Sequence, residues 1–203
     1  MKIWFKLLAF TLFLGTCVYI ISLASDKKQL ENEVLRLHVV GASDSKEDQE
    51  VKLLVRDAVL KQVEELTIDA CSKDEAQRML AESLNVLEDA ANEVLEQRAC
   101  SQRAVVSLKQ EAFPKREYDT FSLPAGVYDS LRITIGEGAG RNWWCVVFPS
   151  LCIPAASKDT ADVAAGAGFS NSLSGAITGE GKYQVRFFLL DIWGRLEKFF
   201  FKG

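Results

Sequence analysis

The chain has 203 residues with 24 basic residues, 28 acidic residues and one histidine, and its formal net charge is −4. This length is sufficient for one domain with a hydrophobic core. The acidic balance argues against nucleic acid or an anionic lipid surface as a partner, because phosphate repels such a domain unless its basic residues cluster. The sequence contains no such cluster.

The first 24 residues form an apolar segment whose only charges are Lys2 and Lys6. The apolar run from 7 to 23 ends in Ser22-Leu23-Ala24, with small residues where signal peptidase requires them, so we expect export and cleavage after Ala24. The run also approaches the roughly 20 residues that cross a bilayer, so an uncleaved membrane anchor is the alternative. In either case the bulk of the chain lies outside. Without Lys2 and Lys6, 22 basic residues face 28 acidic ones, a net charge of −6.

Residues 25–33 are a short polar stem, and 34–154 carry the pattern of an α+β domain. In the run from Val34 to Val40, every second residue is apolar, which predicts a half-buried strand with Arg36 and His38 directed away from the core. Ser45 and Asp48 then resemble a weak capping box, and an apolar stripe predicts a helix to about Leu66.

A second amphipathic helix is predicted from Asp74 to Gln97, forming a hairpin with the first. Cys71 precedes this helix and Cys100 follows it, so the two would lie roughly 35 to 40 Å apart. A disulfide requires α-carbons within about 7 Å, so we do not expect these two cysteines to pair within the chain.

Strand patterns follow from Ala104, with further alternation at 131–135 and at 143–148. The glycines between 136 and 140 precede a strand rather than a helix, so they indicate a turn and not a dinucleotide-binding loop. The predicted fold is therefore α+β: an antiparallel sheet of about four strands packed with a two-helix hairpin.

The C-terminal quarter has a different character. Residues 155–182 are rich in Ala, Gly and Ser and are predicted to form a flexible tether. Residues 183–203 have apolar and aromatic residues at helical spacing, which predicts an amphipathic helix. This helix either packs on the core or binds a groove or membrane surface. Membrane contact is expected through residues 4–24 or through this helix.

Cys145 and Cys152 flank a Phe148-Pro149-Ser150-Leu151 turn that brings the two sulfurs together. In an exported protein we expect a disulfide here, and closing this short loop would stabilise the fold by about 2.5 kcal/mol. Two buried free thiols are the alternative.

A catalytic role is less well supported. Cys145 would need a base, and His38 is the only histidine that could serve, but the sequence does not place them together. No closely spaced Cys or His pair of the zinc type is present, and the aspartates at 44, 48 and 57 do not match a calcium loop. We therefore expect no catalytic residue, no metal and no cofactor.

Trp143 and Trp144 are adjacent in a predicted strand, so their side chains point to opposite faces. One enters the core while the other is directed outward, unless a neighbouring element covers it. An outward tryptophan in a clamped loop suits a protein partner.

Several blocks of residues together resemble stage II sporulation protein R of endospore-forming bacteria. The blocks lie in order between about 34 and 153 and comprise Leu35 to Val40, Ser43-Asp44-Ser45, Asp48-Gln49, Lys52-Leu53, Val55 to Leu60, Glu111 to Pro114, Leu123 to Tyr128, Leu131-Arg132, Gly136-Glu137-Gly138 and Asn142 to Cys152. Gly41-Ala42 and Ser150 depart from the family pattern, and the C-terminal segments match least well.

The resemblance implies an intercellular signalling protein, exported across the forespore membrane into the intermembrane space. There it would activate a membrane-embedded aspartic peptidase of the mother cell that cleaves the sigma-E precursor. Its expected partner surface comprises Trp143 or Trp144, the clamped loop and the face of Arg36 and His38. An extracytoplasmic enzyme that uses Cys145 and His38 is the alternative.

Overall fold

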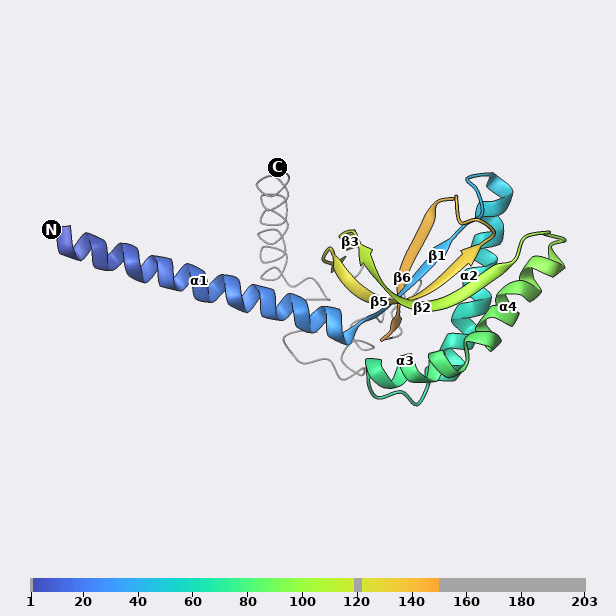
Figure 1. The fold of residues 1–203 in the computed structure, drawn as a ribbon, viewed down its shortest axis with the longest axis horizontal. Coiled ribbons are helices and arrows are strands. Elements are labelled where there is room, and N and C mark those ends of the chain that lie inside the picture. Colours follow the sequence, from blue (N-terminus) through green and yellow to red (C-terminus); the bar gives the residue numbers. More distant parts are fainter. Residues whose placement is uncertain (1, 119–121, 150–203) are drawn as a thin grey trace.

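The computed structural model describes residues 2–118 and 122–149, which contain four helices and six strands in the order α1-β1-α2-α3-α4-β2-β3-β4-β5-β6. The helices are α1 (Lys2–Glu33), α2 (Lys46–Thr67), α3 (Lys73–Glu82) and α4 (Leu84–Gln97). The strands are β1 (Leu35–Val40), β2 (Ala104–Phe113), β3 (Arg116–Glu117), β4 (Ser122–Leu123), β5 (Gly126–Ile135) and β6 (Asn142–Phe148). This arrangement confirms the predicted α+β class (Figure 1). The predicted tether and C-terminal helix lie outside the described residues.

The main sheet has the strand order β2-β5-β1-β6 and is mostly antiparallel. β5 pairs antiparallel with β2, and β6 pairs antiparallel with β1, but β1 and β5 run parallel. The prediction of an antiparallel sheet missed this parallel pair. Parallel neighbours require a long crossover connection, and the three helices after β1 supply it.

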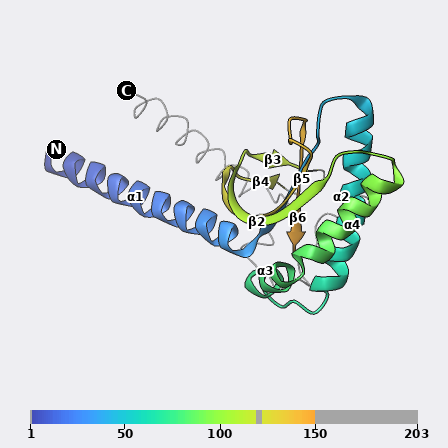
Figure 2. The same cartoon turned by 45° about the vertical axis from the view of Figure 1, so that its right-hand side comes forward.

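Helices α2, α3 and α4 cover one face of the sheet (Figure 2). The predicted start of α2 is confirmed, because Ser45 precedes the helix and its side chain accepts a hydrogen bond from the backbone N–H of Asp48. The single helix predicted from 74 to 97 is wrong, since the chain leaves helical geometry at Ser83. The break gives α3 and α4 separate directions, and Leu80 and Leu87 are both fully buried.

The core lies between these helices and the sheet. Most of its members are aliphatic side chains from one face of the four-stranded sheet and from the facing sides of α2, α3 and α4. The buried cluster includes Leu35, Leu37, Val39, Val55, Val59, Val63, Leu80, Leu87, Ala91, Leu95, Val106, Leu131, Ile133, Ile135 and Val147.

Strand β1 is buried on both faces rather than half-buried as predicted. It lies between β5 and β6, and aromatic side chains cover its second face, as described below. The turn between β5 and β6 is confirmed: Gly136 and Gly138 have φ values of +57° and +64°, which glycine adopts without a steric penalty.

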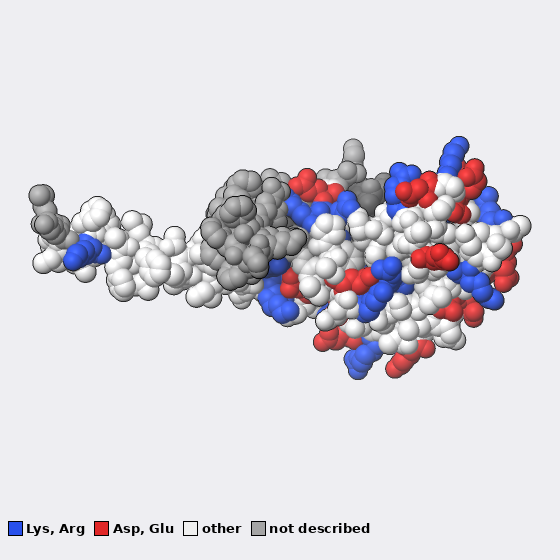
Figure 3. Space-filling view, turned by 45° about the horizontal axis from the view of Figure 1, so that its top comes forward, with Lys and Arg blue, Asp and Glu red and all other residues white. Residues whose placement is uncertain are grey.

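Helix α1 projects from the domain, and its last turns pack against the domain (Figure 1). Among the described residues, the helix from Ile3 to Glu33 is long and apolar enough to cross a membrane, which is compatible with a signal or anchor segment. Figure 3 shows an almost uncharged surface along it, whereas basic and acidic side chains intersperse over the domain. The expected stem, 25–33, forms the end of this helix, where Leu30 is only 1% exposed.

Candidate functional site: the sheet face opposite the helices

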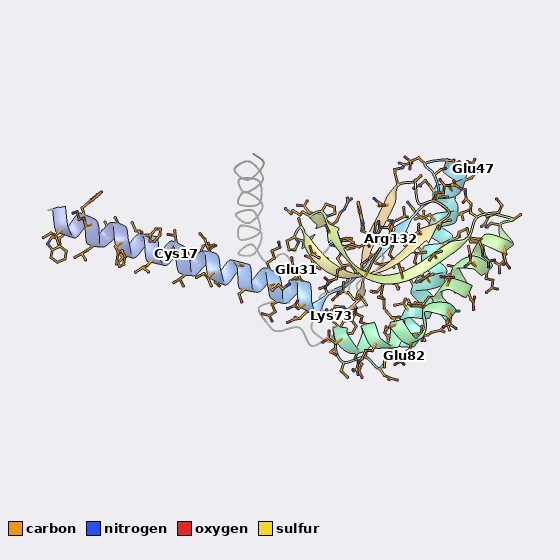
Figure 4. All side chains as sticks on the ribbon, viewed as in Figure 1. Cys17, Glu31, Glu47, Lys73, Glu82 and Arg132 are labelled. Atoms are coloured by element: carbon orange, nitrogen blue, oxygen red, sulfur yellow. The ribbon has the colours of Figure 1, made fainter. Side chains whose placement is uncertain are left out.

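Polar and aromatic side chains gather on the sheet face that α2, α3 and α4 leave uncovered. The alternation of each strand places them there, because residues between core positions point to the opposite face. In the register of the sheet, His38 is level with Arg132 of β5 and with Trp144 of β6. Figure 4 shows Arg132 on the side of the curved β2–β5 pair that faces away from α3 and α4.

His38 lies at the centre of this face and is 8% exposed. Its Nδ1 is 3.1 Å from Oε2 of Glu111, and its Nε2 is 2.9 Å from Oδ1 of Asn142. Its ring also packs on Trp144, with centroids 5.7 Å apart. These contacts from two other strands, β2 and β6, fix the orientation of the imidazole.

Glu111 joins the histidine to Arg132. The Nη1 of Arg132 donates a hydrogen bond of 2.6 Å to Oε1 of Glu111, so each carboxylate oxygen has a partner. Burial alone would raise the pKa of Glu111, but the hydrogen bonds from Arg132 and His38 outweigh it and hold the pKa below its usual value. Glu111 is therefore a stable anion between two nitrogen donors.

Arg36 is fully buried beside this cluster. Its Nη2 donates a hydrogen bond of 2.9 Å to the hydroxyl of Tyr118, and its guanidinium carbon lies 4.2 Å from the ring centroid of Phe113 and 5.2 Å from that of Tyr128. Burial lowers the pKa of Arg36, and Tyr118 and Tyr128 partly offset this effect. The expected direction of Arg36 is confirmed, but the expectation that its face is open is wrong at this position, because aromatic rings cover it.

The two tryptophans point to opposite faces, as the alternation predicts. Trp143 packs against the core and lies under the guanidinium of Arg56, 4.7 Å from its ring centroid. Trp144 packs between His38 and the guanidinium of Arg116, which lies 3.8 Å from its ring centroid. Both are half-buried, so neither is a fully exposed anchor.

Cys145 points to the helix-covered face, where it is 3% exposed and forms part of the core cluster. It is disulfide-bonded. Its predicted partner, Cys152, lies outside the described residues, so the pairing stays a prediction. Cys71 and Cys100 are free thiols. Because Cys145 and His38 lie on opposite faces of the sheet, the geometry does not form a Cys/His pair.

Sequence reasoning missed four residues of this site: Tyr118, Glu111, Arg132 and Asn142. The last three belong to the motif blocks that carry the family resemblance, and they lie in the strands β2, β5 and β6. The sequence thus placed these residues in motif blocks. It did not predict that they surround His38, because this depends on a strand order that places β1 between β5 and β6. Within the described residues, no group of three or more His, Cys, Asp or Glu side chains is arranged to hold a metal ion.

Comparison with known proteins agrees with the motifs. The family model of stage II sporulation protein R matches residues 31–158. Stage II sporulation protein R of Bacillus subtilis (strain 168) is 37% identical over 123 residues, a match that covers 61% of this chain and 55% of that protein. The chain thus spans little more than half the length of this relative, and no solved structure matches it. Since the family model covers more than half of the chain, this protein belongs to the stage II sporulation protein R family.

Proposed function

We propose that this chain is an exported sporulation signal that activates a membrane-embedded aspartic peptidase of the mother cell, which then cleaves the sigma-E precursor. Family membership supports a role in sporulation. The apolar α1, compatible with a signal or anchor segment, supports delivery across the forespore membrane. To activate the peptidase, the domain must bind its active state more tightly than its inactive state.

The observation that carries this proposal is the division of the sheet into two faces. One face is packed under α2, α3 and α4, whereas the other carries the half-buried side chains of Arg132 and Trp144, held in place by contacts with the buried His38 and with Glu111. A rigid surface with an aromatic side chain and arginine suits a protein partner. We assign the peptidase contact to this second face.

The same geometry weakens the alternative of an extracytoplasmic Cys/His enzyme. Such an enzyme would need the thiolate of Cys145 within hydrogen-bond reach of His38. Cys145 is instead disulfide-bonded and lies on the other face of the sheet.

The direct test is to produce this chain, the candidate peptidase and the sigma-E precursor together in a host that lacks other sporulation proteins. We expect precursor cleavage only when all three are present. Cleavage without this chain, or no cleavage with it, would contradict the proposed function.

A matched pair of variants tests the assigned face. Trp143 and Trp144 are neighbours in the chain, both half-buried, and each lies against an arginine, but they point to opposite faces. We expect Trp144→Ala to reduce precursor cleavage by roughly tenfold or more, because a tryptophan at the centre of an interface carries a large share of the binding energy. Trp143→Ala should lower the free energy of unfolding but leave cleavage near the wild-type level at matched amounts of folded protein. Equal loss in both variants would remove the assignment of the face.

A further inference from the structure

The side chain of Arg36 has hydrogen-bonding capacity that the fold does not use. Of its three guanidinium nitrogens, Nη2 donates to Tyr118, but Nε and Nη1 have no hydrogen-bond partner. No carboxylate of residues 2–118 and 122–149 forms an ion pair with it. Buried polar groups are almost always paired, so two unpaired nitrogens on one fully buried cation require an explanation.

Ser130 adds a third unused group at the same place. Its Oγ is buried without a hydrogen-bond partner. Ser130 and Arg36 are directly opposite in the parallel β1–β5 register, and both side chains point to the face opposite the helices. The sheet therefore carries a buried guanidinium and a buried hydroxyl on paired positions of one face, and both have hydrogen-bonding capacity that the described residues do not use.

Packing against aromatic rings does not account for this arrangement. Phe113 and Tyr128 offer Arg36 the attraction of their ring faces, a cation–π interaction that strengthens when water is excluded. These contacts do not offset the larger cost of removing the guanidinium charge from water. A carboxylate would complete the site, because its two oxygens match the fork of a guanidinium and can also accept from a hydroxyl.

The surrounding charges favour the binding of a negatively charged group. Arg116 stacks on Trp144, and its positive charge further lowers the pKa of Arg36. Arg132 and Lys109 lie on the same sheet face. Both form ion pairs with one carboxylate, that of Glu111. This basic face on an otherwise acidic chain would attract a negatively charged segment.

We propose that Arg36, assisted by Ser130, recognises a carboxylate side chain in an acidic segment of the partner protein. Tyr118, a neutral phenol, occupies one side of the guanidinium in the free protein, and the incoming carboxylate takes its place. This inference rests on the proposed function and specifies the chemistry of its docking step. Arg36 then contributes to binding of the carboxylate, although its buried charge lowers the stability of the folded protein.

This inference predicts that one substitution should reduce activity without reducing stability. Arg36→Met has similar length, is uncharged and packs between aromatic rings, so we expect it to unfold at the same or a higher denaturant concentration than wild type. In the three-component host, it should lower precursor cleavage by roughly tenfold or more, as removal of one partner from a buried charge pair does. Arg36→Lys should keep the charge but lose part of the cleavage, because an ammonium cannot bind both oxygens in plane.

Arg56→Met is the matched control. Arg56 also lies over a tryptophan ring, but on the helix-covered side and paired with Asp57. Its replacement should leave precursor cleavage near the wild-type level. Arg36→Met with normal stability and normal cleavage would overturn the inference, and so would a loss of cleavage that only follows a loss of stability.

A binding measurement tests the carboxylate without the peptidase. The Nε–H resonance of Arg36, identified by its absence from the spectrum of Arg36→Lys, can be followed by NMR in the full-length chain in detergent micelles. We expect acetate to shift this resonance saturably and acetamide, its neutral isostere, not to. No response to acetate would overturn carboxylate recognition whatever the variants do. Failure of wild type to support any cleavage would instead contradict the proposed function.

Discussion

At the scale of single residues, the cluster on the sheet face opposite the helices depends on the charge of Glu111. Its side chain is 13% exposed and accepts hydrogen bonds from Arg132 and His38. These bonds outweigh the cost of burial and lower its pKa in the folded state. A carboxyl group with a lowered folded-state pKa stabilises the fold above its unfolded pKa of about 4.3, and this contribution is lost as the pH falls through the folded-state pKa.

We therefore predict a pH-dependent effect of Glu111→Gln. At about pH 7 the variant should lose roughly 1 to 2 kcal/mol of unfolding free energy, because hydrogen bonds to a charged group are replaced by weaker ones. At about pH 3 the difference from wild type should shrink, since the carboxyl is then largely protonated in the unfolded chain and its stabilising contribution decreases as the pH approaches the lowered folded-state pKa. Urea unfolding at the two pH values measures this.

The control for this prediction is Glu137→Gln, the same change on the exposed turn between β5 and β6. It should alter the stability little at either pH. If the gap between Glu111→Gln and wild type were equal at both pH values, the ionised carboxylate would not be the source of the effect.

The sequence predicts the direction of these side chains but not their surroundings. Alternation along β1 correctly placed Arg36 and His38 away from the core. It could not reveal the rings of Phe113 and Tyr128 over Arg36 or the hydroxyl of Tyr118 beside it, because these residues lie more than 70 positions away in the chain and leave no local periodic signal. The partner role of these residues stays a prediction.

At the scale of elements, the end of α1 belongs to the folded domain. Leu30 is 1% exposed, and Glu31 lies so close to Gly126 of β5 that a Cβ atom there would be 2.2 Å from its Oε1. Figure 4 shows Glu31 where α1 meets the domain. The stem is thus a docked helical turn rather than a loose spacer.

Leu30→Ala should destabilise the domain by roughly 2 to 4 kcal/mol, the usual cost of a cavity left by a buried leucine. Denaturant unfolding of the full chain in detergent measures the change. Ile21→Ala on the same helix, where the side chain is 68% exposed, serves as the control and should leave the domain stability nearly unchanged. Equal behaviour of the two variants would mean that Leu30 is not docked in solution.

Elements were predicted best where periodicity is local. The strand at 35–40 and the helix from Ser45 follow from alternation and capping and were confirmed. The break at Ser83 was missed because the residues on both sides continue the same apolar stripe, and serine is tolerated within helices. The parallel β1–β5 pair was missed because strand order depends on long-range packing, which a single sequence does not encode locally.

At the scale of the whole molecule, the fate of α1 decides whether the domain is released or held at the membrane. The helix is continuous from the apolar segment into the residues that pack on β5, so an uncleaved chain would hold the domain close to the bilayer surface. Cleavage after Ala24 would free the domain and leave Leu30 in place. Both products therefore retain the same folded core.

We predict cleavage after Ala24, which gives a mature chain that begins at Ser25. Ala24→Phe should block this step, because signal peptidase requires a small residue on the N-terminal side of the cut, and the chain should then stay in the membrane fraction. Leu23→Phe places the same ring one position earlier, where size is tolerated, and should be processed normally. Intact-mass measurement after membrane fractionation distinguishes the products. A wild-type chain that keeps its first 24 residues would instead establish α1 as a permanent anchor.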